Sequence, residues 1–262
     1  MKYVLKFFPL LCFVTSSAIA YPSGTQFGVG LSVTTGLNAF AGFVNKNAES
    51  FWGKRFGYRI DFAGTKIIRS RINSAINRVM DGRDIEVGDY LCVQGGEIDA
   101  KHFGGMVDFY PFGNTWFLGG WRLSGGYYSG QFNAWSRMAE AGGPGEFNIG
   151  NSRYWYGDGV LRAGVTADWK YDGPYVGTGF DLGLIAGFKI YLDAGIVFTR
   201  KVATLNLDVP EEDLYQWNGL GWNPVDVEAL ARDKENALYD VQHDVDKVKY
   251  FPIVKLGLMY RF

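Results

Sequence analysis

The sequence predicts an all-β fold, a transmembrane antiparallel β-barrel whose neighbouring strands run up and down. Three observations predict it. The chain begins with an export signal, later segments place apolar residues at alternate positions, and the last of these ends on Phe262. No stretch after residue 20 holds the long apolar run that a membrane-spanning helix requires. Alternation of an apolar and a polar face is typical of transmembrane barrels, although a soluble β-sandwich also alternates.

Residues 1–20, MKYVLKFFPLLCFVTSSAIA, have the three parts of an export signal. Two lysines precede an apolar run over residues 7–14, and the sequence Ala-Ile-Ala at 18–20 offers small residues around a cleavage point. The apolar run is too short to span a bilayer as a helix. We therefore expect residues 1–20 to be a signal peptide and residues 21–262 to form one barrel domain in the cell envelope.

The composition excludes several classes of protein. The chain has 26 Lys+Arg against 27 Asp+Glu, so no strong positive field points to a nucleic-acid partner. The 36 glycines and 17% aromatic residues, with 20% charged residues, suit neither a disordered chain nor a helical membrane bundle. After the signal only Cys92 remains as a thiol, and the two histidines lie far apart. We therefore expect no disulfide, metal site or cofactor.

Alternating segments recur along the mature chain and define the expected strands. The first long segment, residues 27–44, contains a turn at 34–36. Residues 170–173 (Lys-Tyr-Asp-Gly) read as a turn between two further strands. The remaining strands are expected over residues 51–62, 103–110, 116–129, 159–169, 174–182, 189–198, 202–209 and the C-terminal segment.

The number of strands follows from three segments too long for turns, residues 63–102, 130–158 and 210–247. Bacterial barrels keep periplasmic turns short, place long loops outside and normally have an even number of strands. If all three segments lie outside, an even number of crossings separates each from the next. Ten strands, with breaks at 34–36 and 199–201, meet this condition and are preferred. Eight strands remain an alternative.

Charged residues within the expected strands are assigned to the interior. A charge facing lipid costs roughly 2–4 kcal/mol at the bilayer midplane. The apolar residues between them are expected to face lipid, including Leu161, Ala163 and Val165. The candidate lumen-lining residues are Asp108, Arg122, Arg162, Asp168, Asp193, Lys255 and Arg261. The predicted lumen is therefore polar and of mixed charge.

The C-terminal stretch VKLGLMYRF completes the pattern as a closing strand. Its apolar residues are expected to face the outer-membrane lipids, and Tyr260 and Phe262 to sit at the periplasmic aromatic girdle. An alternating strand with a terminal Phe also resembles the signal read by the outer-membrane assembly machinery. The residues assigned to that signal are Leu258, Tyr260 and Phe262.

Two of the long segments carry helical patterns. Apolar residues recur at helical spacing over 68–79 among basic residues, and Asn223-Pro224 reads as the start of a second helix. Residues 210–246 hold ten acidic residues, which form either a solvated surface or a cation-attracting rim that could dock on the basic helix. The candidate rim residues are Glu211, Glu212, Asp213, Asp226 and Glu228.

No pattern for catalysis is present, and we expect no enzyme. Acyl transfer or hydrolysis needs a nucleophile with an oriented base. No G-x-S-x-G occurs, His243 has no serine at a suggestive spacing, and His102 opens a strand, where a rim position is expected.

Several stretches together resemble one family. They are VTTGLNAFAGF (33–43), VDFYPFGNTWFLGGWRLSGGYY (107–128), DGPYVGTGF (172–180), LDAGIVFTRKVATLNL (192–207) and FPIVKLGLMYRF (251–262). Their order is similar to that of small proteobacterial outer-membrane barrels that include the CarO-type ornithine-uptake proteins. Thr199-Arg200-Lys201 stands where that family often has a Gly-Asn-Pro or Gly-Ser-Pro turn. The resemblance implies the barrel, and transport of basic amino acids.

Two functions follow as hypotheses. The first is a narrow channel for small cationic solutes, supported by the mixed-charge lumen, the acidic third loop and the resemblance. The alternative is a non-transporting surface protein for adhesion, host contact or envelope integrity, supported by the long loops and their aromatic residues.

Overall fold

The structure is a computed structural model, and it is described here over residues 22–80, 85–87 and 91–262. The predicted signal peptide, residues 1–20, lies outside the described residues. Within the described part of the chain, no helix is both long and apolar enough to cross a membrane.

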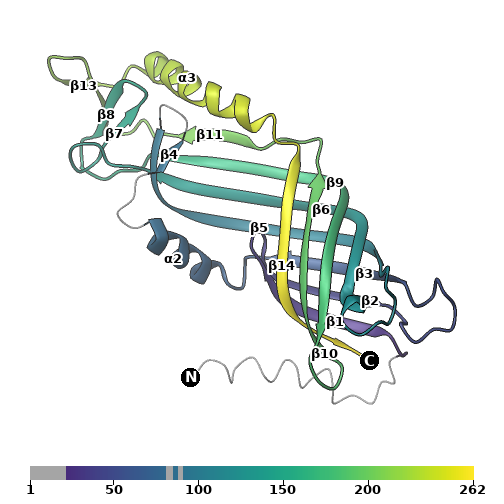
Figure 1. The fold of residues 1–262 in the computed structure, drawn as a ribbon. Coiled ribbons are helices and arrows are strands. Elements are labelled where there is room, and N and C mark those ends of the chain that lie inside the picture. The colour runs from purple at the N-terminus through teal and green to yellow at the C-terminus, as the bar shows by residue number, and fades with distance from the viewer. Residues whose placement is uncertain (1–21, 81–84, 88–90) are drawn as a thin grey trace, which may run out of the picture.

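Eight antiparallel strands form a closed ring (Figure 1). The order around the ring is β1-β2-β3-β5-β6-β9-β10-β14, and β14 pairs with β1 to close it. Their bounds are β1 Thr25–Ser32, β2 Gly36–Phe43, β3 Phe56–Gly64, β5 Leu91–Phe109, β6 Trp121–Met138, β9 Gly164–Gly183, β10 Phe188–Phe198 and β14 Tyr250–Arg261. We call the end of the ring that holds the C-terminus the lower end, and the opposite end the upper end.

The preferred count of ten strands is wrong for the ring. The two strands expected over 159–169 and 174–182 are one strand, β9, because the expected turn at 170–173 stays paired with β6. Position 173, within this strand, is occupied by glycine because any larger side chain there would collide with the Phe198 carbonyl. Sequence reasoning read Asp-Gly as a turn, whereas the glycine serves a close approach of two backbones.

The strand expected over 202–209 lies outside the ring. It forms β11, Thr204–Asp208, which pairs with the upper part of β9 at residues 164–168. The lower part of β9 pairs instead with β10. All three long segments nevertheless emerge at the upper end, between β3 and β5, between β6 and β9, and between β10 and β14 (Figure 1).

A second folded unit, which we call the distal domain, stands above the ring. It comprises residues 139–163 and 204–246 with the upper parts of β5, β6 and β9 (Figure 1). A four-stranded sheet in the order β13-β12-β8-β7 belongs to it. The further elements are α2 Arg69–Met80, β4 Ile85–Val87, β7 Glu146–Ile149, β8 Ser152–Tyr156, β12 Leu214–Trp217, β13 Trp222–Pro224 and α3 Val227–Val245, with a 3₁₀ turn η2 Leu118–Gly120 at the lower end.

The distal domain has its own apolar core. Leu161, Ala163 and Val165, which sequence analysis assigned to a lipid-facing surface, are buried in it. That assignment is wrong because this part of the chain lies above the ring. The core consists of Leu91, Val93, Met138, Phe147, Ile149, Tyr154, Tyr156, Leu161, Ala163, Val165, Leu207, Val209, Leu214, Leu230 and Ala237.

Both helical patterns correspond to helices, and only the expected start of the second one is displaced. The spacing over 68–79 is confirmed as α2, which packs along β5. The expected start of the second helix at Asn223-Pro224 is wrong, because these residues form β13 and pair with β12. Helix α3 begins after Asp226, whose side chain accepts hydrogen bonds from the N–H groups of Glu228 and Ala229. Within the described residues its main packing partners are β11 and β7, whereas docking on α2 was expected as an alternative.

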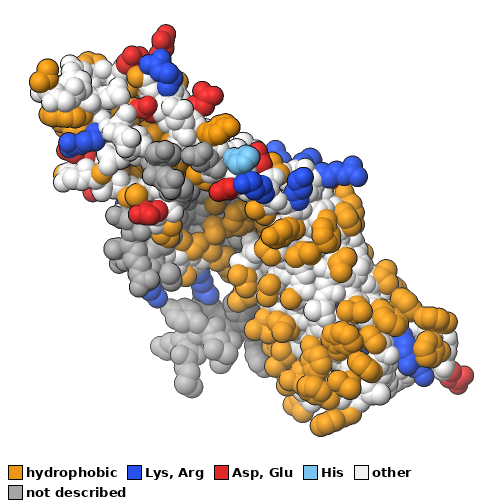
Figure 2. Space-filling model, turned by 45° about the horizontal axis from the view of Figure 1, so that its top comes forward, with side chains coloured by type: hydrophobic (Ala, Val, Ile, Leu, Met, Phe, Trp, Pro, Cys, Tyr) orange, Lys and Arg blue, Asp and Glu red, His pale blue; other side chains and the backbone are white. Residues whose placement is uncertain are grey.

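The outer wall of the ring is apolar. Along β14, Leu256 is 57% exposed whereas its neighbour Lys255 is 2% exposed, which confirms the alternation expected for this strand. Figure 2 shows the hydrophobic surface over the ring. We call this surface the apolar band; it includes Val29, Leu31, Tyr58, Ile60, Phe62, Phe103, Val107, Leu123, Tyr127, Val176, Leu192, Val254, Leu256 and Leu258.

Candidate functional site

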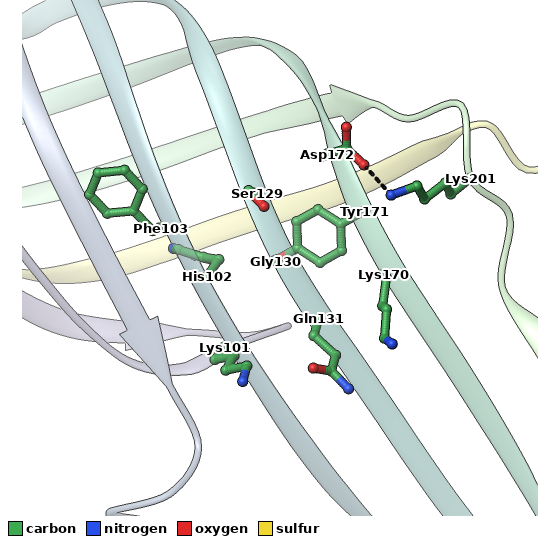
Figure 3. Close-up of a pocket in the computed structure, with 10 residues that line it drawn as sticks. All are labelled: Lys101, His102, Phe103, Ser129, Gly130, Gln131, Lys170, Tyr171, Asp172 and Lys201. Atoms are coloured by element: carbon green, nitrogen blue, oxygen red, sulfur yellow. Dashed lines mark ion pairs between the residues drawn. The ribbon is translucent and has the colours of Figure 1, made fainter.

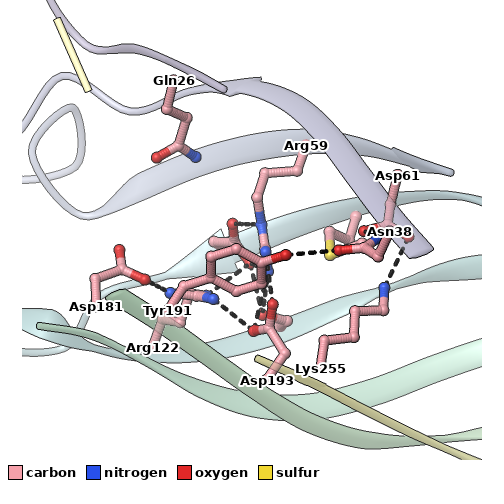
Figure 4. A network of polar contacts seen from close by, with 12 residues as sticks. Gln26, Asn38, Arg59, Asp61, Arg122, Asp181, Tyr191, Asp193 and Lys255 are labelled. Carbon is pink, nitrogen blue, oxygen red and sulfur yellow. Dashed lines mark hydrogen bonds and ion pairs between the residues drawn. The ribbon is translucent and has the colours of Figure 1, made fainter. Parts of the chain in front are cut away.

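The interior of the ring holds a cluster of charged side chains, which we call the interior network. Inward positions alternate along each strand, so each contributing strand supplies one or two members. All of their side chains are at most 8% exposed. The members are Arg59, Asp61, His102, Asp108, Arg122, Asp181, Asp193, Lys255 and Arg261. Figure 4 labels Arg59, Asp61, Arg122, Asp181, Asp193 and Lys255 among them.

Arg59 spans the middle of the ring. Its Nε donates to Asp108 Oδ2 at 2.6 Å, and its Nη1 donates to Asp193 Oδ2 at 2.9 Å. Asp193 lies on β10, which is diametrically opposite β3 in the strand order. Arg122 on β6 also pairs with Asp193. The two guanidinium groups and the shared carboxylate therefore cross the full width of the interior (Figure 4).

A second group of contacts lies above this centre, around Asp61. His102 Nε2 and Lys255 Nζ each lie 2.7 Å from Asp61 Oδ1. Lys255 Nζ also donates to the Tyr128 hydroxyl at 2.8 Å. Asn38 Nδ2 donates to the other Asp61 oxygen at 2.9 Å. The carboxylate of Asp61 is thus contacted from three other strands.

A third group lies below the centre, around Asp181. Arg122 and Arg261 both pair with its carboxylate, Arg261 Nη2 at 2.7 Å from Oδ2. Below them, Lys46 reaches in from the turn after β2. Its Nζ donates to the Gly119 carbonyl and lies 3.8 Å from the centre of the Tyr110 ring. The Lys46 side chain thus connects the turn after β2 to the turn between β5 and β6.

Aromatic side chains fill the interior above the network. Tyr171 and Phe251 stack with ring centres 4.0 Å apart, and Tyr128 contacts Tyr175 at 4.9 Å. These residues belong to a buried cluster with Met106, Val197 and Ile253. The aromatic side chains and the ion pairs are interlocked, since Tyr128 accepts from Lys255 and Arg122 pairs with both Asp181 and Asp193.

Small residues make room for these large ones. A side chain at Gly179 would meet the Asp193 carboxylate and the Arg122 guanidinium, and one at Gly104 would meet the Tyr128 ring. Burying charges is costly, and pairing with good geometry offsets that cost. The close packing indicates an interior that is filled by its own side chains.

The structure brings together five of the predicted lumen residues. Asp108, Arg122, Asp193, Lys255 and Arg261 all lie in the interior network.

The structure does not bring Arg162 and Asp168 there. Arg162 precedes β9, is exposed and pairs with Asp158, and Asp168 is exposed on the upper part of β9. Both differ from their predicted inward placement because they lie above the ring.

Other members were missed by sequence analysis. Arg59 and Asp61 occupy the inward positions of β3, and their alternation with outward Tyr58 and Ile60 is the sequence signal that could have identified them. His102 is not at a rim but buried against Asp61. Asp181 lies near the end of β9, and its inward position follows only once the strand is known to be continuous.

The predicted acidic rim lies apart from the interior. Glu211, Glu212, Asp213, Asp226 and Glu228 lie on the distal domain, in the turn before β12 and at the start of α3. Asp226 has a structural role as the cap of α3. Among the residues that the structure describes, no group of three or more His, Cys, Asp or Glu is arranged to hold a metal ion.

The predicted assembly-signal residues close the ring. Leu258 faces outward and is 47% exposed, and the rings of Tyr260 and Phe262 lie 4.7 Å apart. The Phe262 N–H donates to the Thr25 carbonyl, and the Phe262 carbonyl accepts from the Gly24 N–H. The chain end is therefore fixed to the start of β1.

The distal domain carries an aromatic cluster at its far end. Trp222 lies 5.4 Å from Trp217 and 5.7 Å from Trp155, measured between ring centres, and Arg153 lies over Trp217 and Trp222. Trp155 also contacts Tyr215. Trp217 and Arg153 are exposed, whereas Trp155, Tyr215 and Trp222 are half-buried on this side of the four-stranded sheet.

A hydrogen bond joins the other side of this sheet to α3. The Tyr154 hydroxyl donates to Asp233 at 2.6 Å. Burial raises the pKa of Tyr154, and this hydrogen bond raises it further. The tyrosine therefore keeps its proton and holds the helix against the sheet.

Comparison with known proteins identifies the fold. No protein-family model and no curated protein matches the chain. The crystal structure of Acinetobacter baumannii CarO matches 91% of this chain and 98% of its own, with a TM-score of 0.51 and 13% identity. Acinetobacter baumannii CarO2 matches 92% and 99%, also with a TM-score of 0.51 and 13% identity. A major outer membrane protein from Thermus thermophilus is similar at a TM-score of 0.44. At this identity the likeness concerns the fold, and the chain has the fold of the CarO and CarO2 outer-membrane proteins.

Proposed function

We propose that the chain is an outer-membrane β-barrel, closed through its interior, that holds a folded distal domain at the cell surface. The observation that carries the proposal is the interior network, which crosses the ring between opposite strands and is almost completely buried. A ring of eight strands has an interior that side chains can fill. In this role the chain binds no cofactor and catalyses no reaction.

The apolar band supports the membrane part of this proposal. Large continuous apolar surfaces on a protein mark contact with lipid or another protein. Here the apolar residues face outward and the charges inward, which is the arrangement of a barrel surrounded by lipid. After export by the signal peptide, the closing strand with Leu258, Tyr260 and Phe262 fits recognition by the outer-membrane assembly machinery.

The distal domain supports the surface part. It has a packed apolar core, so it is a folded unit rather than a set of loose loops. Its aromatic cluster includes Trp217, which is 36% exposed. Exposed aromatic residues with an arginine are the residue types enriched at the centres of protein interfaces. We therefore propose contact with other cells or surfaces as the function of this domain.

One observation favours passage of small cationic solutes as a second candidate. The interior carboxylates are paired with side-chain ammonium and guanidinium groups, as Asp61 is with Lys255 and Asp193 with Arg122. Lysine, ornithine and arginine carry the same groups, so such a solute would compete for the same carboxylates by exchange of partners. Passage would require the network to open in steps.

Flux through proteoliposomes separates the two candidates. The protein is reconstituted and the uptake of lysine and ornithine is compared with that of liposomes holding an unrelated closed eight-stranded barrel. A closed barrel gives no uptake above this control. Saturable uptake that Asp193→Asn abolishes would favour the transport candidate instead.

A binding assay tests the surface function directly. Cells displaying the protein are compared with cells displaying Trp217→Ala/Trp222→Ala, and we expect adhesion to fall several-fold. Trp116→Ala is the matched control, since Trp116 is 99% exposed but lies at the lower end. Equal adhesion of all three forms would show that the aromatic cluster does not contribute to adhesion.

A further inference from the structure

A basic groove lies on the outer wall at the upper border of the ring. Its volume is about 470 Å³, and the polar side chains that line it include Lys101, Ser129, Gln131, Lys170, Asp172 and Lys201 (Figure 3). We call it the basic groove. It crosses β5, β6 and β9, and Lys201 comes from the turn that follows β10.

The strand register aligns its central residues in one row. Lys101 is paired with Gln131, and Gln131 is paired with Lys170, so these three positions lie side by side on adjacent strands. All three alternate with inward residues and therefore point outward. Neighbouring strands are about 4.8 Å apart, so the two lysine stems stand about 10 Å apart with the amide between them. The next row below holds Phe103, Ser129 and Asp172.

The charges of the groove are not balanced. Lys101 and Lys170 are exposed, and neither forms an ion pair with any residue in the described part of the chain. Lys201 Nζ lies 3.0 Å from Asp172, whose carboxylate also accepts from the Tyr127 hydroxyl. The lining residues, three lysines and one aspartate, carry an excess of two positive charges, and Asp99 and Asp168 stand in the adjoining row above Lys101 and Lys170.

The row sits where the apolar band ends. Directly below it, outward positions hold Phe103, Tyr127 and Val176, which are all more than half exposed. Above it, the paired positions are Asp99, Asn133 and Asp168. Figure 2 shows Lys and Arg side chains along this border of the hydrophobic surface. A molecule bound in the groove would thus have cations at its head and apolar surface beside its lower part.

We propose that the basic groove binds the phosphate-bearing headgroup of a glycolipid in the outer leaflet, whose acyl chains lie along the apolar band. Lysine ammonium groups, the Gln131 amide and the Ser129 hydroxyl all donate hydrogen bonds, which suits phosphate oxygens. Basic residues next to a bilayer attract anionic lipids. The proposal rests on the proposed outer-membrane location, and it commits to a lipid rather than to free phosphate.

Native mass spectrometry of the full mature chain in neutral detergent tests this proposal. The probe is bis-phosphorylated lipid A, titrated against the unmodified protein and against Lys101→Gln/Lys170→Gln/Lys201→Gln. We expect the apparent affinity of the triple variant to be at least tenfold weaker. The matched control, Lys54→Gln/Lys234→Gln/Lys247→Gln, removes the same charge from the lower turn and from the region of α3, and should bind within twofold of the unmodified protein.

Three outcomes would overturn the proposal. They are equal binding by the groove variant, equal binding of lipid A from which both phosphates have been removed, and displacement of lipid A by millimolar inorganic phosphate. Circular dichroism first establishes that each variant is folded. Because the assay uses folded protein in micelles, failure here leaves the outer-membrane location standing, and cell fractionation tests that location separately.

Discussion

The ring and the distal domain are built from the same strands but have opposite interiors. Strand β9 runs through both. Its inward face begins with buried Val165 in the apolar core of the distal domain and ends with Asp181 in the interior network. The polarity of its outward face changes in the opposite direction, from charged Lys170 to apolar Val176. This inversion is what the proposed membrane location requires, because a strand that passes from water above into lipid below meets different surroundings along its length.

The largest expected effect comes from breaking the ring interior. Arg59→Met removes the side chain that bonds both Asp108 and Asp193. Leaving a buried charge without its partner costs about 3–5 kcal/mol. We expect this loss in the free energy of unfolding, measured by urea titration in vesicles with tryptophan fluorescence.

Arg162→Met is the matched control for that experiment. Arg162 lies above the ring in an exposed pair with Asp158, and pairs of this kind contribute about 0–1 kcal/mol. Equal losses for the two variants would mean that the interior charges are hydrated, and the closed barrel would have to be abandoned.

A loss of stability of similar size, confined to the distal domain, is expected from a substitution in the distal core. Phe147 is fully buried between Tyr154 and Tyr156, and Phe147→Ala costs about 3–5 kcal/mol in a packed core. We expect local unfolding of the distal domain, detected as faster proteolysis within residues 139–163. The ring should keep its heat-dependent electrophoretic mobility. Simultaneous loss of both would show that the two units fold as one.

The difference between the two units also explains which predictions from the sequence were right and which were wrong. Alternation identified the ring strands and the inward positions of Asp108, Arg122, Asp193, Lys255 and Arg261, because polarity there follows a strict period of two. The same rule misplaced residues 161–165, which lie in the distal core. A period of two separates two faces but does not tell which of them meets lipid, water or a core.

The predicted number of strands was wrong for a related reason. A break in a strand and a close approach of two backbones both favour glycine, so Asp172-Gly173 read as a turn. Contacts across the ring, such as Arg59 with Asp193, join residues 134 positions apart. No local pattern contains such a pairing, and only the closed strand order determines it.

A smaller effect is expected at the acidic surface of the distal domain. Asp226→Ala removes the cap of α3 and should cost about 1 kcal/mol, as for other N-terminal caps. Hydrogen exchange of the first amides of α3 should become faster. Glu212→Ala is the control, since Glu212 is an exposed member of the same predicted rim and caps no helix. If both changes act alike, charge rather than capping governs this surface.

The smallest effect concerns one exposed ion pair after α3. The Lys247 ammonium lies 2.8 Å from Asp244 and lowers the pKa of that carboxyl from its ordinary value of 3.8. A lowered pKa stabilises the folded chain at neutral pH, and this contribution is lost as the pH falls below about 4. Lys247→Gln should raise the pKa of Asp244 toward 3.8, measured by NMR titration, without changing the ring. If the pKa stays low in the variant, the neighbouring His243 rather than the lysine would be its cause. The interior pairs differ from this one because their side chains are almost completely buried, so that removing one partner leaves a buried charge uncompensated.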